Sequence, residues 1–132
     1  MSILRVALLH LAPRWGDLAY NCASVETATT GAATWAANWA MTPELCLCGR
    51  EFCSGIGSTW IEPQPDTWVQ QICRVAARER MSVLLSHPKG DRDTAKLHNS
   101  VLVIATDGTI IDTHHKVHAV PTVSALLSLS KN

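Results

Sequence analysis

Short apolar runs alternate along this chain with longer segments of helical periodicity. Residues 4–11 are mostly apolar and stop at Pro13, which is typical of a short buried strand. A second apolar run, residues 39–42, stops at Pro43, and residues 82–86 form a third. The spacing of these runs predicts strands that are separated by helices.

Two segments between the apolar runs carry helical patterns. Asp17 can cap a first helix that continues through the alanine-rich stretch before Asn38. A second helix is predicted over residues 68–80, where Thr67 and Gln70 form a capping-box pattern at the start. The apolar residues of this helix share one face: Trp68, Ile72, Val75 and Ala76.

The strongest turn signal in the sequence is the dipeptide at positions 107–108, Asp-Gly. It lies between two apolar runs, residues 100–105 and 110–113, and therefore predicts a β-hairpin. The order strand, helix, strand, helix, strand, hairpin predicts an α/β layered domain with a mixed sheet and two main helices.

Two further segments lack apolar periodicity. Residues 45–65 are irregular and contain several glycines, so we expect a long functional loop rather than a packed element. Residues 87–98 are polar, and we expect a second loop there.

Composition limits the classes of function. Hydrophobic residues make up 47% of the 132 positions and charged residues 17%, which favours a globular domain over a disordered segment. Eleven basic and eleven acidic residues cancel, so we expect neither a nucleic acid nor an anionic membrane as partner. The sequence shows no signal peptide and no membrane-spanning run, and it contains five cysteines, an odd number. We therefore expect a cytoplasmic protein whose cysteines are free thiols.

Three local patterns carry candidate chemistry. Residues 42–49 read Thr-Pro-Glu-Leu-Cys-Leu-Cys-Gly, residues 98–101 read His-Asn-Ser-Val, and residues 115–118 read His-Lys-Val-His. In order and spacing they resemble the nitrilase superfamily of carbon–nitrogen hydrolases. In that family a Pro-Glu-Leu enters a glycine loop, and an Asn-Ser strand leads through an Asp-Gly turn to a Lys-x-His.

The resemblance implies a four-layer α-β-β-α sandwich that commonly dimerises, of which this chain corresponds to about the first half. Residues 1–132 are then a single incomplete domain, similar to the family over residues 1–123 and divergent over residues 124–132. Half of a sandwich exposes sheet edges and an apolar face. We therefore expect the isolated chain to form homo-oligomers or to aggregate.

The resemblance also implies a reaction that needs no cofactor and no metal. In the family a cysteine attacks the carbon of a small amide or nitrile, a glutamate takes the thiol proton, and a lysine stabilises the charged intermediate. Glu44 matches the general base, and Lys116 matches the oxyanion stabiliser. Partial burial at the end of a strand can raise the pKa of such a glutamate. No cysteine follows Lys116, so we expect a truncated chain without the nucleophilic cysteine and inactive alone.

Three alternatives stay open. Cys46 would share a face with Glu44 in an extended segment and could be a relocated nucleophile, although a buried cysteine that packs as a small hydrophobe is the simpler interpretation. The chain could also be a non-catalytic remnant that binds a partner chain. A structural zinc module could use soft ligands on both sides of the site, although no Cys-x-x-Cys pair is present: Cys46, Cys48, Cys53, His114, His115 and His118.

Overall fold

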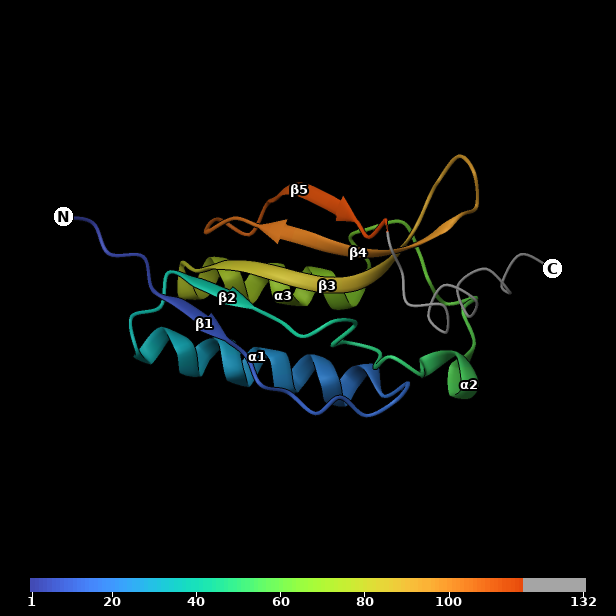
Figure 1. Cartoon of the computed structure of the whole chain (residues 1–132), viewed down its shortest axis with the longest axis horizontal. Helices are drawn as coiled ribbons and strands as arrows, with labels where there is room; N and C mark the ends of the chain where they lie inside the picture. The colour runs from blue at the N-terminus through green and yellow to red at the C-terminus, as the bar shows by residue number, and fades with distance from the viewer. Residues whose placement is uncertain (118–132) are drawn as a thin grey trace.

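Two long helices cover one face of a mixed five-stranded sheet in this protein, seen in a computed structural model that describes residues 1–117 (Figure 1). The strands lie in the order β1-β2-β3-β4-β5, with β1, β2 and β3 parallel and the β3–β4 and β4–β5 pairs antiparallel. The predicted α/β class, mixed sheet and two main helices are confirmed. The elements are β1 (Val6–Leu8), α1 (Leu18–Thr34), β2 (Trp39–Met41), α2 (Phe52–Ile56), α3 (Thr67–Glu79), β3 (Ser82–Gly90), β4 (Leu97–Ile104) and β5 (Ile110–His115).

Helix α1 begins where the sequence predicts it. The carboxylate of Asp17 accepts a hydrogen bond from the backbone N–H of Tyr20 at 3.1 Å, which satisfies one of the unpaired donors of the first turn. Every third or fourth residue of α1 is buried, so the helix packs along one side: Asn21, Cys22, Val25, Thr29 and Ala32. Within residues 1–117, neither this helix nor any other is long and apolar enough to cross a bilayer.

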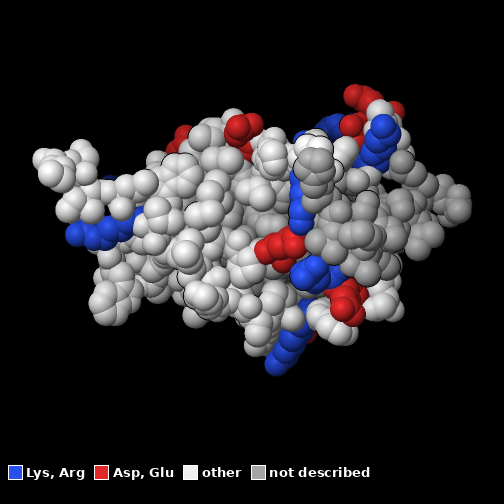
Figure 2. All heavy atoms as spheres, in the orientation of Figure 1, with Lys and Arg blue, Asp and Glu red and all other residues white. Residues whose placement is uncertain are grey.

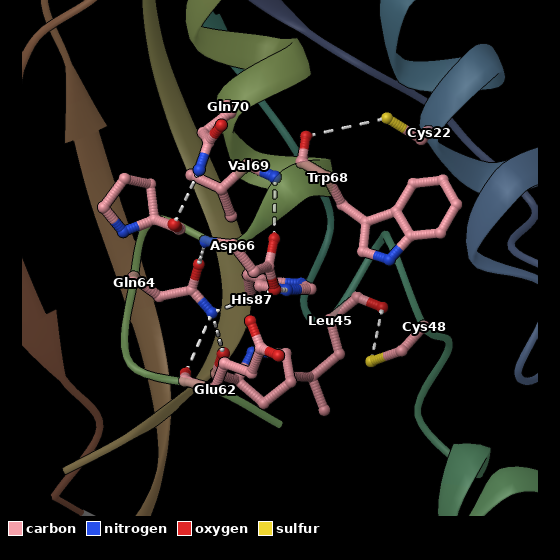
Figure 3. Close-up of polar contacts among 12 residues, drawn as sticks. Cys22, Leu45, Cys48, Glu62, Gln64, Asp66, Trp68, Val69, Gln70 and His87 are labelled. Carbon is pink, nitrogen blue, oxygen red and sulfur yellow. Dashed lines mark hydrogen bonds and ion pairs between the residues drawn. The ribbon is translucent and has the colours of Figure 1, made fainter. Parts of the chain in front are cut away.

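The cap of helix α3 lies one residue earlier than the capping-box pattern predicts. Asp66 is the N-cap, and its Oδ1 accepts the N–H of Val69 at 2.9 Å, whereas Thr67 is already the first helical residue. The other oxygen of Asp66 lies 2.8 Å from Nε2 of His87 on β3, and both side chains are buried (Figure 3). The capping box is therefore wrong, because the tertiary contact with His87 supports a different cap.

The predicted loop over residues 87–98 is confirmed only for residues 91–96, and its two ends belong to strands instead. Strand β3 continues to Gly90 and β4 begins at Leu97, and the pairs Pro88–Asn99 and Lys89–His98 lie in this added part of the ladder. Antiparallel pairing satisfies backbone groups whatever the side-chain polarity, so polar residues can occupy a strand when their partners are in register.

The hairpin predicted around positions 107–108 is confirmed as β4–β5. Gly108 has φ +85°, a conformation that glycine adopts readily. A Cβ at this position would lie 2.6 Å from the backbone oxygen of Cys73 in α3. The hairpin turn therefore packs against the helix so closely that only glycine fits.

The segment predicted as a functional loop, residues 45–65, contains packed structure instead. It holds the short helix α2 and contributes a second small core of Leu45, Cys48, Phe52 and Ile61, all buried. The edge of the Trp60 ring contacts Phe52 with the ring centroids 5.4 Å apart. Glycines made this segment resemble a loop, but the apolar residues between them pack together.

The two faces of the sheet differ in whether helices pack on them. The helix-side face carries the main core, with Ala40, Val83, Leu85, Leu102 and Ile104 all buried. On the opposite face, which we call the open face, Leu8, Met41, Leu84 and Val103 are paired in register across β1 to β4. In Figure 1 helix α3 lies behind β3, and Figure 2 shows few charged side chains over the strands in the same view.

Candidate active site

Glu44 and Lys116 meet at one end of the sheet. Glu44 follows β2 and Lys116 follows β5 directly, and β5 runs in the same direction as β2 because two antiparallel pairings separate β3 from β5. The Nζ atom of Lys116 lies 2.5 Å from Oε1 of Glu44. The side chains of both residues are about one-third exposed, at 35% for Lys116 and 31% for Glu44. The structure thus brings together the two site residues that the sequence singled out.

Asn99 joins these two residues. Its amide Nδ2 donates a hydrogen bond to Oε1 of Glu44 at 2.8 Å, and its backbone oxygen accepts the N–H of Lys116 at 2.8 Å. Asn99 is 6% exposed and lies in β4. One buried residue therefore contacts the carboxylate through its side chain and the lysine through its backbone.

A second cation lies beside the carboxylate. Nε of Arg50 is 3.7 Å from Oε2 of Glu44, on the side away from Lys116. The arginine side chain is 53% exposed, so solvent screens this ion pair. Figure 2 shows basic and acidic side chains side by side near the middle of this face, with other charged side chains toward its edges.

The turn that carries Glu44 is fixed by Ser86 of β3. The hydroxyl of Ser86 accepts the N–H of Leu45 at 2.7 Å, and the N–H of Ser86 donates to the hydroxyl of Thr42 at 2.9 Å. Leu45 has φ +52°, which is unfavourable for a branched side chain and persists only when the surroundings enforce it. Strain of this kind is frequent at functional sites, because it sends adjacent side chains in different directions. Here Leu45 enters the core and Glu44 reaches Lys116.

The pKa of Glu44 departs from the sequence-based expectation. Partial burial acts to raise this pKa, but the hydrogen bonds from Lys116 and Asn99 and the charges of Lys116 and Arg50 outweigh it. The pKa of Glu44 therefore lies below its ordinary value, and the expectation of a raised pKa is wrong. At neutral pH the carboxylate is ionised and ready to accept a proton.

Cys46 is not placed to act as a nucleophile. Residues 44–48 form a turn rather than an extended segment, so the shared face that the sequence suggested does not exist. The thiol of Cys46 is buried and donates to the backbone oxygen of Ser86 at 3.6 Å. Burial raises the pKa of the Cys46 thiol to about 12, which leaves almost no thiolate at neutral pH. The interpretation of Cys46 as a small buried hydrophobe is confirmed.

The ligands suggested for zinc do not converge in the described part of the chain. Cys46 belongs to the main core, whereas Cys48 belongs to the second small core, where its thiol donates to the backbone oxygen of Leu45 at 3.7 Å (Figure 3). Over residues 1–117, no three side chains of His, Cys, Asp or Glu gather so that they could hold a metal ion. His118 and residues 124–132 lie outside the described residues.

Sequence reasoning missed three residues of this site. Asn99 stood inside a recognised pattern, but nothing in the pattern showed that its amide reaches Glu44. Arg50 and Ser86 had no local signal, because one is an ordinary loop arginine in sequence and the other an ordinary strand serine. The proximity of Ser86 to the Glu44 turn depends on the way β2 and β3 pair, and that of Arg50 depends on the course of the turn itself.

Comparisons with known proteins agree with this geometry. The carbon-nitrogen hydrolase family model matches residues 5–128. An amidase from Nesterenkonia sp. superposes with a TM-score of 0.78 at 19% identity, covering 94% of this chain and 46% of that one. Saccharomyces cerevisiae Nit3, a member of branch 10 of the nitrilase superfamily, superposes with a TM-score of 0.74 at 22% identity, covering 87% of this chain and 44% of that one. No curated protein matches the sequence.

The structural likeness establishes the fold, and the chain spans less than half the length of these solved proteins. The family match extends over nearly the whole sequence and includes both Glu44 and Lys116. The chain therefore belongs to the carbon-nitrogen hydrolase family.

Proposed function

We propose that this chain supplies the general base and the oxyanion-stabilising cation of a hydrolase that acts on small, non-peptide amides or nitriles. The contact between Nζ of Lys116 and Oε1 of Glu44 carries the proposal. An ionised carboxylate and an ammonium group fixed side by side are suited to accept a proton and to stabilise a developing negative charge. The Nesterenkonia protein that this chain resembles in structure is an amidase, which supports an amide as the substrate class.

The proposed reaction on an amide has two halves. Glu44 accepts the proton of a cysteine thiol as the sulfur–carbon bond forms, and the charge that develops on the carbonyl oxygen is stabilised by Lys116. The carbon–nitrogen bond then breaks, and Glu44 returns the proton to the leaving ammonia. A water molecule attacks the resulting thioester, Glu44 takes a proton from that water, and the thiol leaves as the acid forms.

We propose that the nucleophilic sulfur comes from outside the 132 residues. Cys22, Cys46 and Cys48 are buried, whereas Cys53 lies in α2 and Cys73 in α3. The solved structures, which are more than twice as long, leave room for the cysteine in the half that this chain does not match.

Ammonia release from acetamide, butyramide and acetonitrile tests this proposal. We expect the purified 132-residue chain to release none above background. Hydrolysis by this chain that Glu44→Gln abolishes would show that it contains its own nucleophile, and the proposed inactivity would be wrong.

The nucleotide sequence after codon 132 provides the second test. If the frame continues to a cysteine, the longer product should hydrolyse amides, and Glu44→Gln or Lys116→Ala should each lower kcat/KM by about 100-fold or more. Glu51→Gln is the matched control, because Glu51 is an exposed glutamate on the neighbouring helix cap. Equal activity of the Glu44→Gln product and the unmutated product would remove Glu44 from the mechanism.

A second candidate function, a fragment that associates through its open face, is favoured by one observation. Val6, Leu8, Met41 and Ile111 are exposed by 44%, 65%, 38% and 65%. Apolar side chains that line up on a sheet face are unfavourable in water and are covered when another layer packs on them. Association of the isolated chain is therefore part of the proposal.

A further inference from the structure

We propose that Asn99 is a positioning residue that divides the two oxygens of the Glu44 carboxylate between two tasks. Oε1 is held by Lys116 and Asn99, and Oε2 is left to take the proton of the thiol. This inference rests on the proposed role of Glu44 as general base, and it adds a residue and an atom to that role.

The first step is the occupancy of Oε1. Lys116 Nζ lies 2.5 Å and Asn99 Nδ2 lies 2.8 Å from this one oxygen, and the two donors come from β5 and β4 ends that are paired with each other. A carboxylate oxygen accepts about two hydrogen bonds. Oε1 is therefore saturated and is a poor acceptor for a third proton.

The second step is the state of Oε2. Among residues 1–117, Arg50 is the cation that pairs with Oε2, and its Nε lies 3.7 Å away, which exceeds the usual length of a hydrogen bond. The arginine side chain is half exposed and can move away without breaking a buried contact. Among the described residues, the hydrogen bonds to the carboxylate thus go to Oε1, and Oε2 keeps its lone pairs.

The third step is the choice of Asn99 as the residue that fixes this orientation. Lys116 has a long, flexible stem and is one-third exposed, so it cannot define the plane of the carboxylate by itself. Asn99 is buried in β4, and its backbone oxygen also accepts the N–H of Lys116 at 2.8 Å. Its amide remains a neutral donor at every pH, so it orients Oε1 without supplying a competing proton.

The pKa of Glu44 in the 132-residue chain tests the role of Asn99. The chain is labelled with ¹³C at the glutamate carboxyl carbons and titrated by NMR, and the Glu44 signal is assigned by its loss in Glu44→Gln. Asn99→Leu has a similar size but no donor, so the pKa of Glu44 should rise toward its ordinary value. Asn38→Leu is the matched control, because the side chain of Asn38 accepts from the N–H of Arg5 beside β1, and it should leave the pKa of Glu44 unchanged.

A folded Asn99→Leu chain in which the Glu44 pKa is unchanged would overturn the proposal, because a merely structural asparagine would give that result. If Asn99→Leu fails to fold, Asn99→Ser removes the same contact with a smaller side chain, and the same rise is expected.

The division between the oxygens has its own readout in the unmutated chain. Infrared difference spectra between the unmutated chain and Glu44→Gln isolate the two carboxylate stretching bands of Glu44. Donors on one oxygen alone should separate the bands more widely than in free glutamate, and a separation equal to that of free glutamate would overturn the proposal. Neither measurement requires turnover, so a failure of hydrolysis would contradict the proposed function separately from this inference.

Discussion

Lys116 and Glu44 are 72 positions apart in the chain, yet the lysine Nζ lies 2.5 Å from the glutamate Oε1. The contact follows from topology, because β2 and β5 run in the same direction and end at the same edge of the sheet. Functional residues gather at the carboxyl ends of strands in layered α/β folds for this reason. Both charged groups of the proposed site are therefore placed by the residues of this chain alone.

The stability of the chain should depend on pH through Glu44. Because the folded-state pKa is below the ordinary value of 4.5, Glu44 contributes stability above that value, and this contribution is lost as pH falls through the folded pKa. The free energy of unfolding in urea should fall as the pH drops below about 4.5, and Glu44→Gln should reduce the size of that fall. Glu51→Gln is the control and should leave the fall as it is. An identical pH profile for Glu44→Gln and the unmutated chain would contradict the prediction.

The two helix caps should differ in their contribution to stability. Asp66→Ala removes the cap of α3 and leaves His87 buried without its partner, so it should destabilise the chain by roughly 2–4 kcal/mol. Asp17→Ala removes a cap on α1 whose side chain is 46% exposed, and it should cost about 0.5–1 kcal/mol. Chemical denaturation measures both variants. Equal losses would show that the Asp66–His87 contact adds nothing to the cap.

Two glycines should respond in opposite ways to replacement by alanine. Gly108→Ala should destabilise the chain by about 2–4 kcal/mol, because φ is positive and the new Cβ would meet the Cys73 backbone oxygen at 2.6 Å. Gly31→Ala should stabilise it by about 0.5–1 kcal/mol, because Gly31 lies within α1 with open space around it. Thermal and urea unfolding give both values, and a stable Gly108→Ala chain would mean that the hairpin turn does not pack on α3 as described.

The cysteines should separate into two classes of reactivity. Iodoacetamide at about pH 8, followed by mass spectrometry, should modify the partly exposed Cys53 and Cys73 before the buried Cys46 and Cys48. Burial raises the pKa of all four thiols, to about 12 for Cys46, so little reactive thiolate is present. The order in which the thiols are modified therefore reflects both their accessibility and their low thiolate fraction. Addition of denaturant should make the four rates similar and provides the control. Rapid native modification of Cys46 would restore it as a candidate nucleophile.

The open face should control association of the isolated chain. Leu8→Lys combined with Ile111→Lys places charge on two strongly exposed apolar positions of β1 and β5, and should shift the chain from oligomers or aggregates toward a monomer. Trp35→Lys is the control, because Trp35 is 84% exposed at the end of α1, away from the sheet face. Analytical ultracentrifugation measures the distribution. A monomeric unmutated chain with a sharp, cooperative melt would contradict the proposed association.

Local signals in the sequence were sufficient for some features. Asp17 caps α1 and the dipeptide at 107–108 forms the hairpin turn, because a cap and a tight turn each depend on a few adjacent residues. The predicted loop over residues 87–98 is too long at both ends, because the pairing of residues 87–90 with residues 97–100 depends on register and not on their own polarity. The sequence pattern also predicted Thr67 as the α3 cap in place of Asp66, because the buried partner of Asp66, His87, is 21 positions away in the chain.

The sequence by itself determined the order of strands and helices, the family resemblance, and Glu44 and Lys116 as the candidate pair, because these are carried by local periodicity and short motifs. Only the tertiary structure decided that Asn99, Arg50 and Ser86 surround or support Glu44, and that the pKa of Glu44 is lowered instead of raised. A pKa is set by the charges and donors within a few ångströms, and sheet pairing brings those groups together from distant parts of the chain.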